Sequence, residues 1–291
     1  MRGTNKRTAF DLFMKGVQAR SFPMTQSTWE DSDDWFRQAI AEDTAMSFDD
    51  ARDAGVGFPR AWAWMAYGLA LTAHEDWQPD SSLPEAVALA DLAVQLDEND
   101  YDTHWVAAFV QLTNGNSTQA EFHRDEALYL VGEDRNLHLL NEMADVLVWL
   151  GKPDDAYMML KKTRRTTDWN RWSMAWSQYF RARDEPSRYE EALIEAENTF
   201  WKPGNEHYEM DMQLLIAAIA IQQADFLDSI NLPVEAQLKR DRAIAARDLF
   251  LTHKPNWTLV DEMVRMPFAE TQEAQDTKNH WTGGLVKLGF Q

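Results

Sequence analysis

Apolar residues recur at helical spacing along this chain, and the clearest case is the stretch of 34 residues from 101 to 134. Its first half, Tyr101–Asn114, carries the apolar stripe Trp105, Ala108, Phe109 and Leu112. A Gly-Asn pair then breaks the pattern, and a second stripe follows over Ser117–Val131, with Ser117 as the expected helix cap. The stretch therefore predicts two helices joined by a tight turn.

Small residues recur at the period of this helix pair. Ala86 and Ala93 precede Ala120 and Ala127 by 34 positions. A second set, displaced by 36 positions, aligns Ala108, Gly115 and Ala120 with Ala144, Gly151 and Ala156. Self-similarity at this period is typical of stacked helix pairs, so we predict an all-α solenoid of about six helix–turn–helix units in a right-handed superhelix. Residues 1–291 are expected to form a single solenoid, with 255–291 as a capping tail of two short helices.

The same pattern places the other elements. One helix is expected to begin at Pro59, and the others at 9–20, 28–46, 84–96, 137–150, 154–165, 168–183, 185–199, 206–228 and 234–252. Ser47–Phe58 is expected to be a loop, because it contains two glycines. The acidic run Trp29–Asp34 is expected to be solvated at a helix start, and Asp97–Asp102 to form a turn between repeats.

Several short stretches carry a family resemblance. They are Ala9–Val17, Phe36–Asp43, the Gly-x-Pro-x-x-Ala turn at Gly151–Ala156, the closing segment Trp281–Phe290, and Trp64, Tyr67, Gly68 and Leu71 at the spacing of a Trp-x2-Leu-Gly-x2-Tyr pattern. In these stretches the chain resembles tetratricopeptide-repeat proteins, most of all the modules attached to bacterial class III adenylate cyclases and winged-helix regulators. The resemblance implies a scaffold that binds partners or senses a ligand. The basic clamp with which some such repeats hold a peptide carboxylate has no match here.

Composition limits the partners. The chain has a formal net charge of −20, no cysteine and 13 tryptophans. The absence of cysteine excludes disulfides and thiol chemistry and favours a reducing compartment. The negative charge repels phosphate backbones, so no nucleic-acid partner is expected. No apolar run is long enough to span a bilayer, and we expect a soluble cytoplasmic protein without a membrane partner.

The sequence offers little catalytic chemistry. It has no Gly-x-Ser-x-Gly motif, no phosphate-binding glycine loop and no paired-histidine zinc motif. His138, Glu142 and Asp145 share one helix face, which is expected to be an ordinary polar face. A polar-ligand contact, a metal site or the acid–base group of an all-α enzyme are the alternatives for these three residues. We expect no catalytic residue, no cofactor and no metal.

The first helices of stacked repeats line a concave face, and this face is the predicted binding site. Its residues are expected to be Trp62, Met65, Leu69, Trp105, Phe109, His138, Asn141, Glu142, Asp145, Trp172, Trp176 and Tyr179. For each tryptophan the alternative is core packing between helices. Aromatic anchors beside carboxylates predict a protein or peptide partner that is basic and carries an apolar anchor. A small-molecule sensor with an aromatic groove is the second hypothesis.

Overall fold

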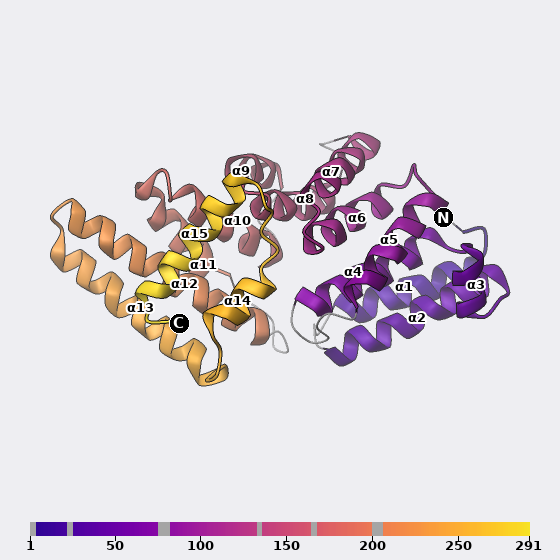
Figure 1. The fold of residues 1–291 in the computed structure, drawn as a ribbon, viewed down its shortest axis with the longest axis horizontal. Helices are drawn as coiled ribbons and strands as arrows, with labels where there is room; N and C mark the ends of the chain where they lie inside the picture. The colour runs from indigo at the N-terminus through magenta and orange to yellow at the C-terminus, as the bar shows by residue number, and fades with distance from the viewer. Residues whose placement is uncertain (1–3, 22–25, 75–81, 133–135, 164–167, 200–205) are drawn as a thin grey trace. The chain divides into compact units, whose positions relative to one another are not determined.

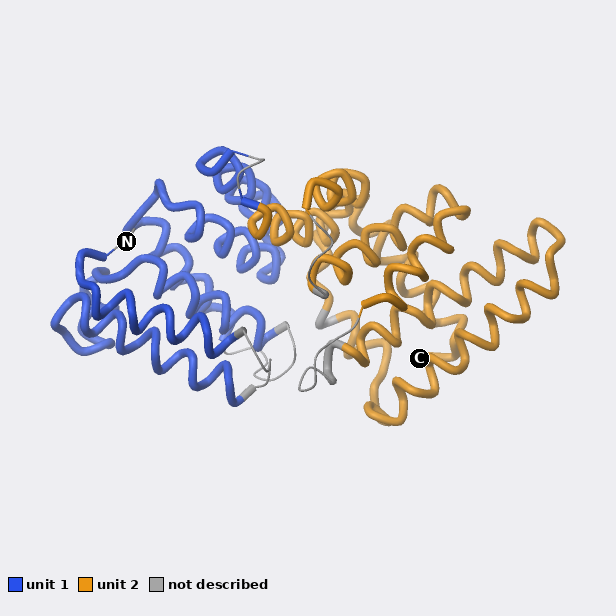
Figure 2. The backbone as a smooth tube through the Cα atoms, turned by 180° about the vertical axis from the view of Figure 1, so that it is seen from behind, with its two compact units in different colours: residues 1–136 blue, residues 137–291 orange. Residues whose placement is uncertain are grey.

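A computed structural model describes residues 4–21, 26–74, 82–132, 136–163, 168–199 and 206–291. Within these ranges the regular structure is entirely helical, with fifteen α-helices, one short 3-10 helix and no strand (Figure 1). The all-α prediction is therefore confirmed for this part of the chain. The chain forms two compact units, residues 1–136 and 137–291, and each is described by itself (Figure 2).

Unit 1 is built from pairs of neighbouring helices. Its described helices are α1 (Arg7–Ser21), α2 (Gln26–Thr44), α3 (Phe48–Ala54), α4 (Pro59–His74), α5 (Leu83–Leu96), α6 (Tyr101–Thr113) and α7 (Ser117–Val131). Helix α1 packs on α2, α4 on α5 and α6 on α7, and α4 also packs on α6. Ala86, Ala108 and Ala120 are fully buried, as expected for residues at close helix crossings.

Unit 2 continues with helix pairs. Its described helices are α8 (Leu137–Trp149), α9 (Pro153–Lys162), α10 (Asp168–Arg181), the 3-10 helix η1 (Pro186–Arg188), α11 (Tyr189–Glu197), α12 (Glu206–Ser229), α13 (Pro233–His253), α14 (Leu259–Arg265) and α15 (Gln272–Lys287). Helix α8 packs on α9, α10 on α11 and α12 on α13. The last expected residues of the 154–165 helix lie outside the described residues. Among the described helices, none combines the length and the apolar character needed to cross a membrane.

Two local predictions were wrong. The segment expected to be a loop at Ser47–Phe58 contains the helix α3, because Ser47 accepts a hydrogen bond from the backbone N–H of Asp50 and two aspartates lie in the first turn. Gly55 then ends the helix with φ 62°. In the central pair, the cap of α7 is Asn116 and not Ser117, since the Asn116 side chain accepts from the backbone of Gln119.

The acidic run Trp29–Asp34 is not simply solvated. It lies inside α2, and Asp33 forms an ion pair with the buried guanidinium of Arg20, which is 4 % exposed. Arg20 Nε donates to Ser32 Oγ at 2.5 Å, and Arg20 Nη1 donates to the backbone oxygen of Trp64. Gly68 on α4 leaves room for this group, since a Cβ there would lie 2.8 Å from Arg20 Cζ. Burial lowers the pKa of Arg20 to about 10, against the attraction of Asp33.

The second acidic run, Asp97–Asp102, lies at the predicted turn: residues 97–100 join α5 to α6, and Tyr101 and Asp102 begin α6. Asp100 caps α6 by accepting from the backbone N–H of Asp102. Arg60, from α4, donates to both oxygens of the fully buried Asp100 carboxylate at 2.6 and 2.9 Å. A planar guanidinium suits this bidentate contact, which fixes the turn to the preceding helix pair.

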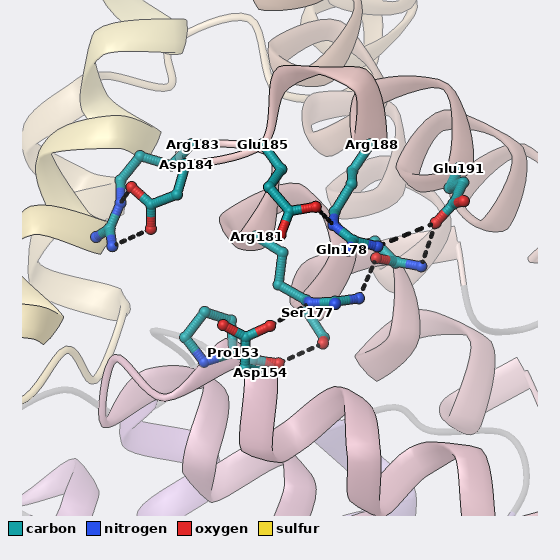
Figure 3. A network of polar contacts seen from close by, with 10 residues as sticks. All are labelled: Pro153, Asp154, Ser177, Gln178, Arg181, Arg183, Asp184, Glu185, Arg188 and Glu191. Carbon is teal, nitrogen blue, oxygen red and sulfur yellow. Dashed lines mark hydrogen bonds and ion pairs between the residues drawn. The ribbon is translucent and has the colours of Figure 1, made fainter.

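Polar contacts hold α10 between its neighbours in unit 2 (Figure 3). Arg181 donates from Nε to Asp154 of α9 at 2.6 Å and from Nη1 to Gln178 at 2.9 Å. Gln178 Nε2 in turn donates to Glu191 of α11 at 2.9 Å. The chain of contacts therefore crosses α10 from one neighbour to the other, and it helps to set the rotation of α10 and the direction of its aromatic face.

Candidate functional site

The twelve predicted binding residues belong to different units. Five lie in unit 1, namely Trp62, Met65, Leu69, Trp105 and Phe109, and seven lie in unit 2, namely His138, Asn141, Glu142, Asp145, Trp172, Trp176 and Tyr179. Within unit 1 the five come from α4 and α6, which pack on each other. Within unit 2 they come from α8 and α10, which also pack on each other.

The unit 1 set consists mostly of core residues. Trp105 is 3 % exposed, and its ring lies 5.1 Å from that of Tyr67. Phe109 stacks edge-on against the same tyrosine at 5.0 Å. The Trp62 indole N–H donates to the backbone oxygen of Val56, at 3.1 Å. Met65 is buried as well, while Leu69 is partly exposed. Core packing, the alternative for the tryptophans, accounts for this burial, and a contact with a partner stays a prediction.

The aromatic face of α10 is covered by the end of the chain itself. Trp172, Trp176 and Tyr179 are buried, and Trp281 of α15 lies against Trp176 with 4.7 Å between ring centroids. Phe268, which precedes α15, meets Trp149 at 5.3 Å. Figure 1 shows α15 lying across α10 and α12. The tail, which was expected to cap the last repeat as two short helices, contains α14 and α15, and α15 runs over 16 residues and packs on both α10 and α12.

Hydrogen bonds and two glycines allow α15 to pack closely on the aromatic face of α10 and its neighbours. Gln222 Nε2 donates to the backbone oxygen of His280 at 2.8 Å and to the Tyr179 hydroxyl at 3.0 Å. A Cβ at Gly284 would lie 2.6 Å from Gln222 Nε2. Gly151, after α8, has φ +79°, and a Cβ there would collide with the backbone of Ala274. Close backbone approach and a positive φ therefore require glycine at position 151, whereas at position 284 a Cβ would displace the end of the Gln222 side chain.

Unit 2 also contains a group of polar side chains, all buried except the partly exposed Glu142. We call it the α8–α10 polar cluster: Asn141, Glu142 and Asp145 on α8, Thr163 after α9 and Asn170 on α10. Asn170 Nδ2 donates to Asn141 Oδ1 at 3.0 Å and to Thr163 Oγ1. Thr163 Oγ1 donates onward to the backbone oxygen of Leu160 at 2.7 Å. Sequence analysis found the α8 members but missed Thr163 and Asn170, whose only signal was a polar residue beside an apolar stripe.

Asp145 is the most unusual member of the cluster. The residue is 6 % exposed, and its Oδ1 has no hydrogen-bond partner among the described residues. The Trp149 indole donates to its carboxyl group. Burial, and then repulsion from Glu142, raises the pKa of Asp145 well above its ordinary value. Burial also raises the pKa of Glu142, which His138 opposes.

The three residues His138, Glu142 and Asp145 run from solvent into the unit. The side chain of His138 is 64 % exposed and that of Glu142 is 11 % exposed, with 3.5 Å between His138 Nδ1 and Glu142 Oε1. The indole N–H groups of Trp172 and Trp176, on the neighbouring α10, are buried and have no hydrogen-bond partner among the described residues. The two packed helices α8 and α10 therefore contain both buried acceptors and buried donors without partners among the described residues.

In the part of the chain that the structure describes, no three histidine, aspartate or glutamate side chains are grouped as a metal ion requires. The cluster can accept hydrogen bonds and favour positive charge, because a cation would relieve the repulsion between its two carboxyl groups. No protein-family model matches the chain, and a comparison with curated proteins gives no match either.

Proposed function

We propose that this chain is a non-catalytic binding scaffold of the tetratricopeptide-repeat type. The order of packing supports this. In both units a first helix packs on its own partner and on the next first helix, as α8 does with α9 and α10. Second helices pack on the next first helix, as α9 does on α10 and α11 on α12. The same order occurs in unit 1, where α4 packs on α5 and α6. Such order is what a stack of repeats requires.

One observation carries the proposal that the first helices form a binding face. In unit 2, α10 and α12 pack against a helix, α15, that does not belong to their own pairs. The contact uses a buried tryptophan, small residues and hydrogen bonds to a backbone oxygen. These are the means by which helical repeats bind an amphipathic segment of a partner. A partner helix or extended segment would use the portions of the first-helix face that α15 leaves accessible.

The partner is proposed to be a protein or peptide segment that is basic and has a large apolar anchor. Glu142 and Asp145 provide the local attraction, and the net charge of −20 would speed the approach of a basic segment. We propose a cytoplasmic protein with no nucleic-acid or membrane partner, since both of those surfaces are anionic.

A matched pair of peptides tests this function. One is a fluorescein-labelled amphipathic peptide with a tryptophan and several lysines, and the other has glutamate in place of each lysine. Fluorescence anisotropy with the full chain should show binding of the basic peptide, weakened as NaCl rises from about 10 mM to about 150 mM. The acidic peptide should bind at least about 10-fold more weakly. Equal affinities, or tighter binding of the acidic peptide, would contradict the proposal.

A further inference from the structure

We propose that the Asp145 carboxyl group is the docking point for one primary ammonium group, presented by a lysine side chain of the partner. The inference rests on the proposed function, since Asp145 lies on the same first-helix face. It adds to that function a specific contact between a primary ammonium group and Asp145 Oδ1. A buried carboxyl oxygen without a partner is costly unless something completes its hydrogen bonding, and Asp145 Oδ1 is such an atom among the described residues.

The face of α8 provides the approach to this atom. His138, Glu142 and Asp145 succeed one another at intervals of four and three residues, about one helical turn each. Their exposure falls along this line, with side chains 64 % exposed at His138 and 11 % exposed at Glu142. A long flexible side chain could lie along this helix face, pass His138 and Glu142, and place its charged end at Asp145. The four-carbon stem of lysine has this form.

The contacts of Asp145 favour ammonium over guanidinium. The Trp149 indole N–H donates to the carboxyl group, which leaves Oδ1 as the oxygen without a partner. A guanidinium binds carboxylates best when its planar fork reaches both oxygens, and one oxygen is already engaged here. An ammonium is a point charge that needs only one oxygen from each of two carboxyl groups, and Glu142 can provide the second.

The Trp149 side chain, which donates to the Asp145 carboxyl group, belongs to a group of packed aromatic rings. The Trp149 ring lies 6.2 Å from that of Trp172 and 5.2 Å from that of Trp176. Ring faces favour a cation and its alkyl stem. The Asn141–Asn170–Thr163 hydrogen bonds hold α8, α9 and α10 together beside the site.

The test uses the full chain with 15N-labelled tryptophan, observed through its indole N–H resonances. Those of Trp149, Trp172, Trp176 and Trp281 are assigned from single Trp→Phe variants. The probe is n-butylammonium chloride, an analogue of the lysine side chain, titrated against NaCl at equal ionic strength. The resonances of Trp149, Trp172 and Trp176 should shift in a saturable way. n-Butanol should produce no saturable shift, and n-butylguanidinium should bind more weakly than the amine.

Two variants that each remove one negative charge distinguish a specific contact at Asp145 from the general attraction of the net negative charge. Asp145→Asn should weaken n-butylammonium binding at least about 10-fold. Asp155→Asn removes an exposed carboxylate on α9 and should leave binding unchanged. An unchanged Trp281 resonance shows that each variant keeps its fold. If Asp145→Asn does not fold, Glu142→Gln and the comparison of ammonium with guanidinium decide the question.

The experiments distinguish a failure of the ammonium site at Asp145 from a failure of the proposed scaffold function. If the basic peptide binds and Asp145→Asn does not weaken it, the docking point is wrong and the scaffold proposal stands. If n-butylammonium binds at Asp145 and no basic peptide binds, the scaffold proposal is wrong. Saturable binding of n-butanol, or equal binding of n-butylammonium to Asp145→Asn and Asp155→Asn, overturns the ammonium site.

Discussion

At the scale of single residues, two histidines in unit 1 are buried against each other. His104 and His123 are 4 % and 6 % exposed, and their Nδ1 atoms lie 3.0 Å apart. The backbone oxygen of Glu98 accepts from His104 Nε2 at 3.0 Å, because a carbonyl oxygen can only accept. His104 Nδ1 is therefore the acceptor for a proton carried on His123 Nδ1. Burial, and then repulsion from His104, lowers the pKa of His123 to about 4.

This pair predicts a loss of stability in acid. Below pH 6.5 the unfolded chain protonates His123 and the folded chain does not, so stability falls as the pH drops from 6.5 to about 4. At about 1.4 kcal/mol per pH unit, this gap contributes up to about 3 kcal/mol. Urea unfolding over this pH range should show a shallower fall for His123→Gln than for the wild type. His253→Gln, at an exposed position, is the control, and an equally steep fall in His123→Gln would contradict the prediction.

A second residue-scale prediction concerns Gly68. Arg20 occupies the space that a Cβ at Gly68 would need, and its guanidinium cannot retreat because Asp33, Ser32 and the Trp64 carbonyl hold it. Gly68→Ala should therefore lower the free energy of unfolding by about 1–3 kcal/mol.

The matched control is Gly283→Ala, on α15, where a Cβ would meet nothing within 4 Å. Alanine has the higher helix propensity, so this variant should gain about 0.5–1 kcal/mol in thermal or urea unfolding. A neutral result for Gly68→Ala would show that Arg20 is not held at this position.

At the scale of elements, the contact of α15 with α10 and α12 joins parts of unit 2 that are far apart in the sequence. Trp281 is fully buried, and the backbone of α15 at Ala274 lies so close to Gly151 that a Cβ there would collide with it. Tyr179 and His280, whose hydroxyl and backbone oxygen lie 3.3 Å apart, are separated by 101 positions, and Gln222 and His280 by 58. Such contacts form only once the earlier helices are in place.

Removal of the Trp281 side chain should destabilise unit 2. Trp281→Ala leaves a large cavity against Trp176, and the loss is expected to be about 3–5 kcal/mol. Val286→Ala, on the exposed side of the same helix, should change stability by less than about 0.5 kcal/mol. Thermal unfolding followed by circular dichroism gives both values. Similar results for the two variants would mean that α15 adds nothing to unit 2.

At the scale of the whole molecule, charge is the dominant property. A formal net charge of −20 at pH 7 opposes compaction, because like charges repel one another more strongly in the compact state. Much of this charge lies on exposed helix faces, where local ion pairs such as Arg247 with Asp248 on α13 contribute little.

Salt should therefore stabilise the protein. Raising NaCl from about 10 mM to about 150 mM shortens the screening length from about 30 Å to about 8 Å, and the melting temperature should rise at pH 7. Near pH 4.7, the isoelectric point of the sequence, the same change should have little effect. Differential scanning fluorimetry at both pH values provides the comparison. A fall in melting temperature with salt at pH 7 would contradict the prediction.

The sequence by itself determined where most helices lie, because helical periodicity and small residues at crossings are local properties of the chain. Ala108 and Ala120 were predicted at close crossings and are fully buried. The same pattern pointed to α8 and its residues Asn141 and Asp145, since side chains on one helix face follow from spacing alone. It missed α3, whose start depends on a cap at Ser47 that the glycines obscured.

Only the tertiary structure decided what meets each helix face. The burial of Arg20 beside Gly68, the His104–His123 contact and the position of α15 over Trp176 all join segments that no local pattern relates. An aromatic stripe has the same spacing whether it faces solvent, a neighbouring helix or the end of the chain. The physical reason is that the sequence pattern reports how apolar a face is, whereas its occupant is chosen by packing between residues far apart in the chain.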